Sequence, residues 1–124
     1  MIRIFTTKTF VRWMRKTGLT DAALCNAVAE MVEGLIDADL GAGLFKKRVA
    51  LPGRGKRASA RTLVASNLGG RWFFLFGFAK NERANVSEQE LKVLQITGQT
   101  FLGWSATEIN TALQAGQLKE INYD

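Results

Sequence analysis

The chain has 124 residues, of which 47% are apolar and 23% charged, and it contains one proline. This length and composition are typical of one compact domain, which we predict over residues 1–124, and exclude a low-complexity or disordered chain. Lysine and arginine number 17 against 11 acids, so the formal net charge is +6. The absence of histidine excludes a Ser-His-Asp triad and the histidine-bearing zinc hydrolase motifs, and the single Cys25 excludes a multi-cysteine zinc site. We therefore expect no metal and no other cofactor.

Hydropathy and the N-terminus indicate where the protein acts. No apolar run approaches the roughly 20 residues that a membrane helix needs. The N-terminal residues Met1–Thr6 lack the long apolar stretch of a secretory signal. We therefore expect a cytoplasmic protein that does not enter a membrane.

The first 40 residues predict a strand followed by two helices. Ile2–Phe5 is short and rich in β-formers, and helical spacing of apolar residues then runs from Phe10 to Gly18, which ends the first helix. Thr20 or Asp21 can cap the second helix. Its predicted buried stripe consists of Leu24, Ala27, Val28, Met31 and Leu35.

The middle of the chain predicts three successive strands with short connections. They cover Leu44–Leu51, Arg61–Asn67 and Arg71–Ala79 and should pair as an antiparallel meander. Strict alternation places four aromatic residues of the third strand on one face (Trp72, Phe74, Phe76 and Phe78) and two apolar residues on the other (Phe73 and Leu75). Apolar residues on both faces are typical of a central strand that is covered on both sides.

Two capping boxes predict helices after the meander, one at Ser87–Glu90 and one at Ser105–Glu108. Leu91 and Leu94 define the inner stripe of the first helix, with Val93 and Ile96 as candidates to widen it, and Thr97-Gly98 as its predicted end. Gly116 ends the second helix, and a short strand can follow over Leu118–Tyr123. These elements together predict an α+β domain: two N-terminal helices packed on an antiparallel-dominated sheet, with further helices after the meander.

The distribution of charge points to a polyanionic partner. From Leu40 to Asn81 there are nine basic residues and no acid, and seven of the nine fall within residues 46–61. The first twenty residues add five more basic residues without an acid. Such a chain should present a basic face, and phosphate backbones bind lysine and arginine with release of counterions. We predict nucleic-acid binding, with a merely solvated basic surface as the alternative.

A smaller set of these cations could carry chemistry. Lys46 and Arg48 should project from one face of their strand and Lys47 from the other. If Arg61 on the next strand points the same way as the pair, three cations converge on one patch of the sheet. Arginine can neutralise a developing phosphorane, and a lysine crowded by cations can act as a general acid or base. This suits cleavage of RNA by its own 2′-hydroxyl, and binding without catalysis stays open.

Further basic residues flank this patch. We assign RNA binding to four of them: Lys47, Arg54, Lys56 and Arg57. The glycine-rich segment Pro52–Ala60, which contains the last three, does not have P-loop spacing. Lys80 and Arg83 follow the third strand and should lie at the mouth of the sheet beside the patch. An ordinary solvated connection is the alternative for both segments.

Three segments resemble the RelE superfamily of toxins, close to its phage-associated and HigB-like branch: Asp37–Gly41, Lys46–Ala50 and Gly77–Asn85. The order of the helices and of the meander is also similar over nearly the whole chain. The resemblance implies a RelE-like fold and a ribosome-dependent mRNA endoribonuclease that a cognate antitoxin blocks, for which a helix-turn-helix protein is one candidate. It also implies that Lys46, Arg48 and Arg61 correspond to the catalytic cations of the family. Lys80 and Arg83 match its following basic segment, and we assign them to the catalytic set as well.

The sequence departs from the family in the group that aids the chemistry. Some members carry a tyrosine or histidine after the last meander strand, whereas the only tyrosine here is Tyr123 and histidine is missing. Ser87 stands near the expected place, where helix capping already explains it. Two other functions stay open: a non-catalytic basic nucleic-acid-binding regulator, and a gyrase-directed toxin similar to the ParE branch.

Overall fold

The computed structural model describes residues 1–51 and 59–123. In these residues the chain runs β1 (Arg3–Thr7), α1 (Lys8–Thr17), α2 (Asp21–Val32), β2 (Ala38–Asp39), β3 (Leu44–Ala50), β4 (Ser59–Ser66), β5 (Arg71–Ala79), α3 (Glu88–Leu102), α4 (Ala106–Gln114) and β6 (Leu118–Ile121). The strands form one sheet in the order β2-β3-β4-β5-β1-β6. Only the β1–β5 pair is parallel. The predicted α+β arrangement with an antiparallel-dominated sheet is confirmed, and β2 is a short strand that the sequence did not indicate.

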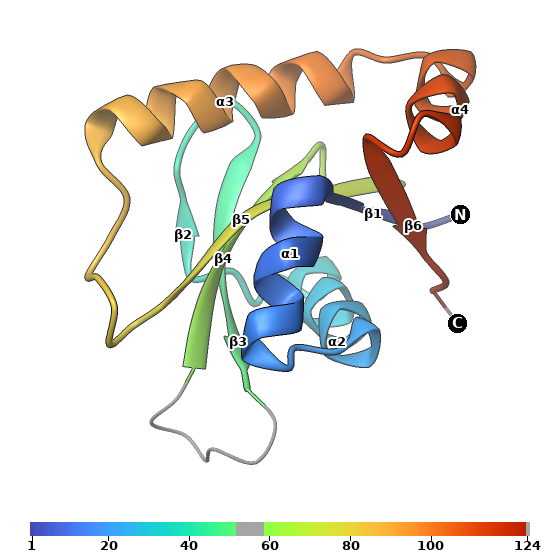
Figure 1. The fold of residues 1–124 in the computed structure, drawn as a ribbon. Coiled ribbons are helices and arrows are strands. Elements are labelled where there is room, and N and C mark those ends of the chain that lie inside the picture. Colours follow the sequence, from blue (N-terminus) through green and yellow to red (C-terminus); the bar gives the residue numbers. More distant parts are fainter. Residues whose placement is uncertain (52–58, 124) are drawn as a thin grey trace.

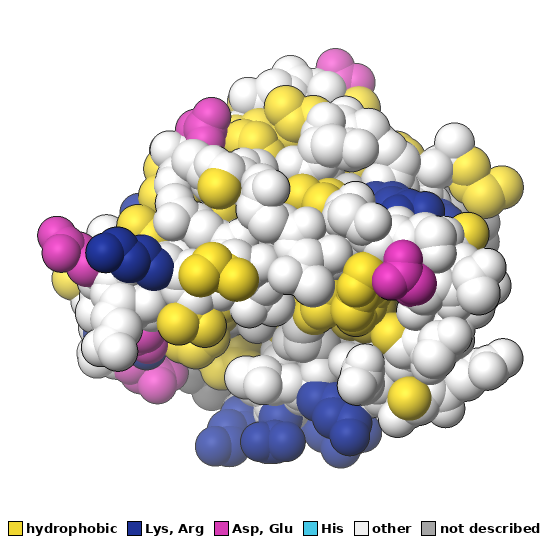
Figure 2. All heavy atoms as spheres, turned by 90° about the horizontal axis from the view of Figure 1, so that it is seen from above, with side chains coloured by type: hydrophobic (Ala, Val, Ile, Leu, Met, Phe, Trp, Pro, Cys, Tyr) yellow, Lys and Arg dark blue, Asp and Glu magenta, His cyan; other side chains and the backbone are white. Residues whose placement is uncertain are grey.

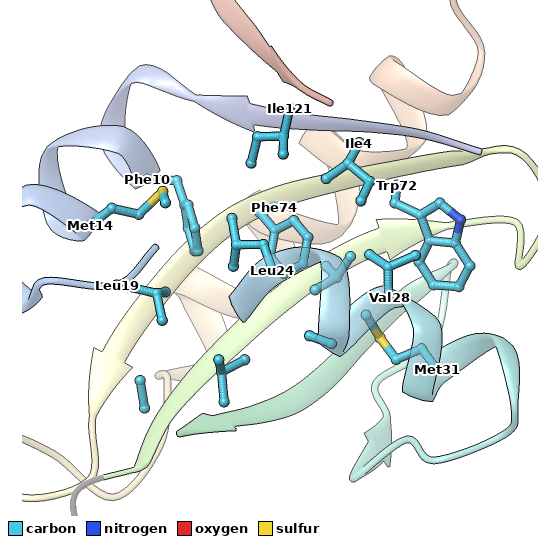
Figure 3. Packing of buried hydrophobic residues seen from close by; sticks show 14 of the residues in the cluster. Ile4, Phe10, Met14, Leu19, Leu24, Val28, Met31, Trp72, Phe74 and Ile121 are labelled. Carbon is cyan, nitrogen blue, oxygen red and sulfur yellow. The ribbon is translucent and has the colours of Figure 1, made fainter. Parts of the chain in front are cut away.

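The sheet lies between two layers of helices (Figure 1). On one face Phe10 and Met14 of α1 and Leu24 of α2 pack against β4 and β5, as Figure 3 shows. On the other face Ile109 of α4 joins a second buried cluster, against which α3 packs. The central position of β5, covered on both faces, is therefore as predicted.

Local sequence signals set the starts of α2, α3 and α4. Thr20 caps α2, and its hydroxyl accepts a hydrogen bond from the N–H of Ala23. Both predicted capping boxes form: the Ser87 and Ser105 hydroxyls accept from the N–H groups of Glu90 and Glu108, whose carboxylates accept in return. These caps satisfy backbone donors within a few residues, so they do not depend on the rest of the fold.

The prediction that Leu35 continues the buried stripe of α2 is wrong. The helix ends at Val32, and Leu35 is 59% exposed. Gly34 adopts a φ of +93°, a conformation that glycine takes without strain, and there the chain leaves the direction of the helix and runs to the edge of the sheet, where β2 pairs with β3. The buried stripe therefore stops at Met31.

Strict alternation along β5 is also wrong beyond Leu75. Leu63 of β4 lies opposite Phe76, but Val64 lies opposite Phe74, so β5 contains one extra residue at this point. Phe76 consequently packs with Phe73 and Leu75 on the α3 side of the sheet, instead of with Trp72 and Phe74 on the α1 side. This bulge transfers the following aromatic residue, Phe78, to the α3 side as well.

The predicted end of a helix at Gly98 is wrong for a different reason. Helix α3 runs through Gly98 to Leu102. A Cβ atom at Gly98 would lie 2.8 Å from the Cβ of Ala65 on β4, closer than real carbon atoms approach. The glycine therefore lets α3 pack tightly on the sheet. Val93 and Ile96, the candidates to widen its inner stripe, are instead 57% and 67% exposed.

Candidate functional site

Three predicted cations meet on the α3 side of the sheet. In the β3–β4 register Arg48 lies opposite Arg61, and Lys46 lies opposite Leu63, whose side chain belongs to the buried cluster on that side. Residues two apart on a strand share a face, so Lys46, Arg48 and Arg61 project together. We call these three side chains the strand face. Arg61 thus points the same way as Lys46 and Arg48, which was the condition for the three cations to converge on one patch of the sheet.

Neighbouring strands hold this face in place. Arg61 is half-buried, and its Nη1 donates to the hydroxyl of Ser59 at 2.7 Å. At the edge of β3, the Arg48 N–H donates to Asp37 Oδ2 at 2.6 Å, and the Asp37 N–H donates to the Lys46 carbonyl at 3.0 Å. None of the three cationic side chains has an ion pair with another described residue. Their charges are thus available to a ligand from outside.

Arg83 completes one side of the site. Phe78 lies opposite Arg61 in the β4–β5 register, and the Arg83 guanidinium lies 5.3 Å and 5.8 Å from the ring centres of Phe76 and Phe78. A two-pronged ion pair, with N–O distances of 2.7 Å and 2.9 Å, joins the same guanidinium to Glu90. Arg83 thus lies beside the strand face, but a carboxylate balances its charge.

The Arg83–Glu90 pair shifts the pKa values of both groups. Hydrogen bonds from Arg83 and from the Ser87 N–H lower the pKa of Glu90 to about 2, and the pKa of Arg83 is raised by the hydrogen bond to Glu90. Both charges therefore persist over the physiological pH range, and the start of α3 is tied to the rim of the site.

The structure separates Lys47 from the other predicted RNA-binding residues. Lys47 is 6% exposed, and its Nζ lies 2.9 Å from both the Leu35 carbonyl and Glu30 Oε1 on the α2 side of the sheet. Its charge is satisfied inside the protein, which favours a structural role for Lys47 over the RNA binding that the sequence predicted. The other three, Arg54, Lys56 and Arg57, lie outside the described residues.

Lys80 stays at the rim of the sheet. It is the first residue after β5, and it is exposed. No contact among the described residues ties its side chain to the strand face. The turn that follows brings Arg83 back over β5, because the Glu82 N–H donates to the Ala79 carbonyl at 3.0 Å.

Helix α1 contributes cations that the sequence analysis did not single out. A hollow of about 280 Å³ lies between α1 and the end of β5, lined by Phe76, Phe78, Glu82 and Arg83 on one side and by Trp13, Arg12 and Lys16 on the other. The i, i+4 spacing of Arg12 and Lys16 in a segment without acids is the signal that could have found them.

The described residues form neither a metal site nor a membrane span. Within residues 1–51 and 59–123, no three Cys, Asp or Glu side chains gather closely enough to hold a metal ion together. In the same part of the chain, no helix has the length and apolar character needed to span a membrane.

Comparison with known proteins assigns the chain to a family. A search of curated proteins gives no match. The family model described as the RelE toxin of the RelE / RelB toxin-antitoxin system matches residues 2–121, nearly the whole chain. The four helices and the six-stranded, mostly antiparallel sheet are consistent with a RelE-like fold. The chain belongs to the RelE toxin family of toxin–antitoxin systems.

Proposed function

We propose that this toxin is a ribosome-dependent endoribonuclease of the HigB-like branch that cuts mRNA and thereby inhibits translation. The observation that supports the proposal most strongly is the strand face, where two arginines from adjacent strands lie opposite each other with Lys46 beside them. Membership of the RelE family supports a toxin function independently of that geometry.

The proposed reaction needs only groups that the strand face offers. The 2′-oxygen of the RNA attacks the adjacent phosphorus, the bond to the 5′-oxygen breaks, and a 2′,3′-cyclic phosphate forms. The 2′-hydroxyl loses its proton as it attacks, and the departing 5′-oxygen receives a proton. Arg48 and Arg61 would stabilise the additional negative charge of the phosphorane, and Lys46 would hold or move a proton beside it. In this proposal Lys80 and Arg83 orient the RNA at the rim.

The remaining contacts follow from charge. We propose that Arg54, Lys56 and Arg57 bind the phosphate backbone of the mRNA on the ribosome. We also propose that residues 1–124 act as a single domain and that the protein works in the cytoplasm. The family implies an antitoxin partner. We propose that this antitoxin is a helix-turn-helix protein and that it covers the strand face with an acidic segment, so that its association is fast and salt-sensitive.

Single-turnover mRNA cleavage on programmed ribosomes tests the proposal, with primer extension to locate the cut. The parent protein should cleave, and Arg61→Ala should fail to cleave at the parental rate at saturating toxin. Lys92→Ala is the matched control, because Lys92 is an exposed cation on α3 without an ion pair among the described residues.

The outcomes separate the alternatives. Equal cleavage by Arg61→Ala and Lys92→Ala would remove the catalytic assignment. Growth arrest without mRNA cleavage but with inhibited DNA supercoiling would identify a gyrase-directed toxin. RNA or DNA binding without growth arrest would identify a regulator.

A further inference from the structure

A second group of cations lies on α1 and β6, on the side of the sheet opposite the strand face. Lys8, Arg12 and Arg15 of α1 and Lys119 of β6 line a hollow of about 420 Å³, together with Thr6 and Leu118. No acidic residue lines this hollow within the described part of the chain. We call these four side chains the α1 surface.

The tertiary structure builds this surface from segments that are more than 100 residues apart. Helical spacing places Lys8, Arg12 and Arg15 along one side of α1. β1 brings Lys119 to them, because Thr6 lies opposite Lys119 in the antiparallel β1–β6 pair. The position that a Cβ atom would take at Gly116 lies 4.0 Å from Lys8 Cε, so the turn before β6 closes one end of the hollow.

The α1 surface carries an excess of positive charge: Asp21 lines a neighbouring hollow with Arg15 and Lys119, but no acid among the described residues lines this one. All four side chains are exposed, and none forms an ion pair with another described residue. By contrast, Arg3 on the neighbouring part of β1 is paired with Glu120 at 2.9 Å. The four charges are therefore free to meet a ligand.

The arrangement also works against helix formation. The first turn of α1 contains no acid, and it contains Lys8, which opposes the helix dipole. Like charges at i, i+3 and i+4, such as Lys8–Arg12 and Arg12–Arg15, destabilise a helix. A bound polyanion would remove both penalties.

The surroundings favour a phosphate backbone over a protein segment. Four of the eight residues that line the hollow are Lys or Arg, whereas the cores of protein–protein interfaces are depleted of charged residues. The exposed apolar side chains Val93 and Ile96 lie on α3 instead. Figure 2 looks down on α3 and shows hydrophobic side chains across that face, with Lys and Arg gathered along the edge where α1 lies.

We propose that the α1 surface is a second RNA-binding site, which holds the phosphate backbone at a distance from the cleaved bond. The proposal rests on the endoribonuclease function proposed above. Arg12 connects the two regions, because it lines both this hollow and the hollow beside Phe76, Phe78 and Arg83. A strand of RNA can thus remain in contact with cations as it passes from the strand face around the end of α1.

The test compares Arg15→Glu and Lys119→Glu with Lys92→Glu, which changes the net charge equally on the far helix α3. The first probe is a 2′-O-methyl RNA oligonucleotide, which cannot undergo attack by a 2′-hydroxyl, titrated at several salt concentrations. For a single strand, each phosphate contact contributes about 0.7 to the slope of log affinity against log salt. Arg15→Glu and Lys119→Glu should each reduce the slope by about this amount, whereas Lys92→Glu should retain the parental slope.

The second probe is the programmed ribosome, on which Arg15→Glu should raise KM more than it lowers kcat. Thermal melts establish that each variant is folded. Equal salt slopes for Arg15→Glu and Lys92→Glu would overturn the inference. Unchanged RNA binding by Arg15→Glu with loss of antitoxin binding would also overturn it and assign the surface to an acidic protein. If the parent binds the oligonucleotide through Arg15 but cleaves no mRNA, the second site stands and the proposed enzymatic function fails.

Discussion

The strand face and the α1 surface are both cationic, yet the protein holds them in different ways. Arg61 is half-buried, with a hydrogen bond to Ser59, and the register of two strands fixes it opposite Arg48. Lys8, Arg12 and Arg15 instead extend from an exposed side of a helix. A reaction needs charges that are placed before the transition state forms, whereas attraction of a polyanion needs only charge density. We therefore propose that the strand face carries the chemistry and that the α1 surface serves association.

The largest expected effect is on the strand face. Arg61→Ala should lower single-turnover cleavage on programmed ribosomes by about 10²–10³, the usual loss when one preorganised group is removed from a transition state. Arg61→Lys keeps the charge but loses the planar guanidinium, which can donate two parallel hydrogen bonds to a phosphate, so it should recover only part of the rate. A parental rate for Arg61→Ala would remove the difference between the two cationic regions.

The next effect tests how α1 is held against the sheet. A Cβ atom at Gly77 would lie 2.4 Å from Cζ3 of Trp13, so Gly77→Ala must displace the indole. We expect it to lower the free energy of unfolding by about 3 kcal/mol, the upper end of the range for overpacking. Gly103→Ala is the control, since its Cβ would meet Gln99 O at an ordinary 3.5 Å. Urea denaturation measures both, and equal stabilities would show that Trp13 does not fix α1.

The adjacent residues Lys47 and Arg48 on β3 should separate stability from RNA binding: a change at the first should affect only stability, and a change at the second mainly RNA binding. Lys47→Met leaves the Leu35 carbonyl without its donor and should lower the free energy of unfolding by about 1–3 kcal/mol, with RNA affinity unchanged. Arg48→Met changes an exposed side chain, so it should alter stability by less than about 0.5 kcal/mol and weaken RNA binding. Urea denaturation of both variants measures their free energy of unfolding, and RNA titration measures their RNA affinity. Weaker RNA binding by Lys47→Met would return that lysine to the RNA-binding set.

The smallest effect concerns the exposed pair of Arg83 and Glu90. Because the folded-state pKa of Glu90 is lowered to about 2, its stabilising contribution is present above its ordinary value near 4.5 and is lost as the pH falls toward 2. Glu90→Gln should therefore destabilise the protein at pH 7, and its effect should fade as the pH falls through about 2. Glu88→Gln removes another acid from the first turn of α3 without breaking this pair. Thermal melts across the pH range measure both variants, and an equal pH dependence would show that the Arg83–Glu90 pair does not stabilise the fold.

Local sequence determined the elements that satisfy their own hydrogen bonds. Ser87 and Ser105 cap their helices with a glutamate three residues later, and Thr20 caps α2, as the residue types alone indicated. The alternation that places Lys46 and Arg48 on one face and Lys47 on the other also depends only on strand geometry. The sequence motifs were sufficient to suggest the toxin family that the family comparison then established.

The tertiary structure decided what depends on contacts between distant residues. The extra residue at Leu75 moves Phe76 to the other face, and such a bulge is visible only when β4 is paired with β5. Gly98 does not end α3; it lies within the helix because its missing side chain makes room for Ala65 on β4. The burial of Lys47 depends on the position of α2, and the α1 surface exists only because β6 pairs beside β1. Periodicity and capping act over a few residues, whereas register, close packing and the pairing of charges require the whole fold.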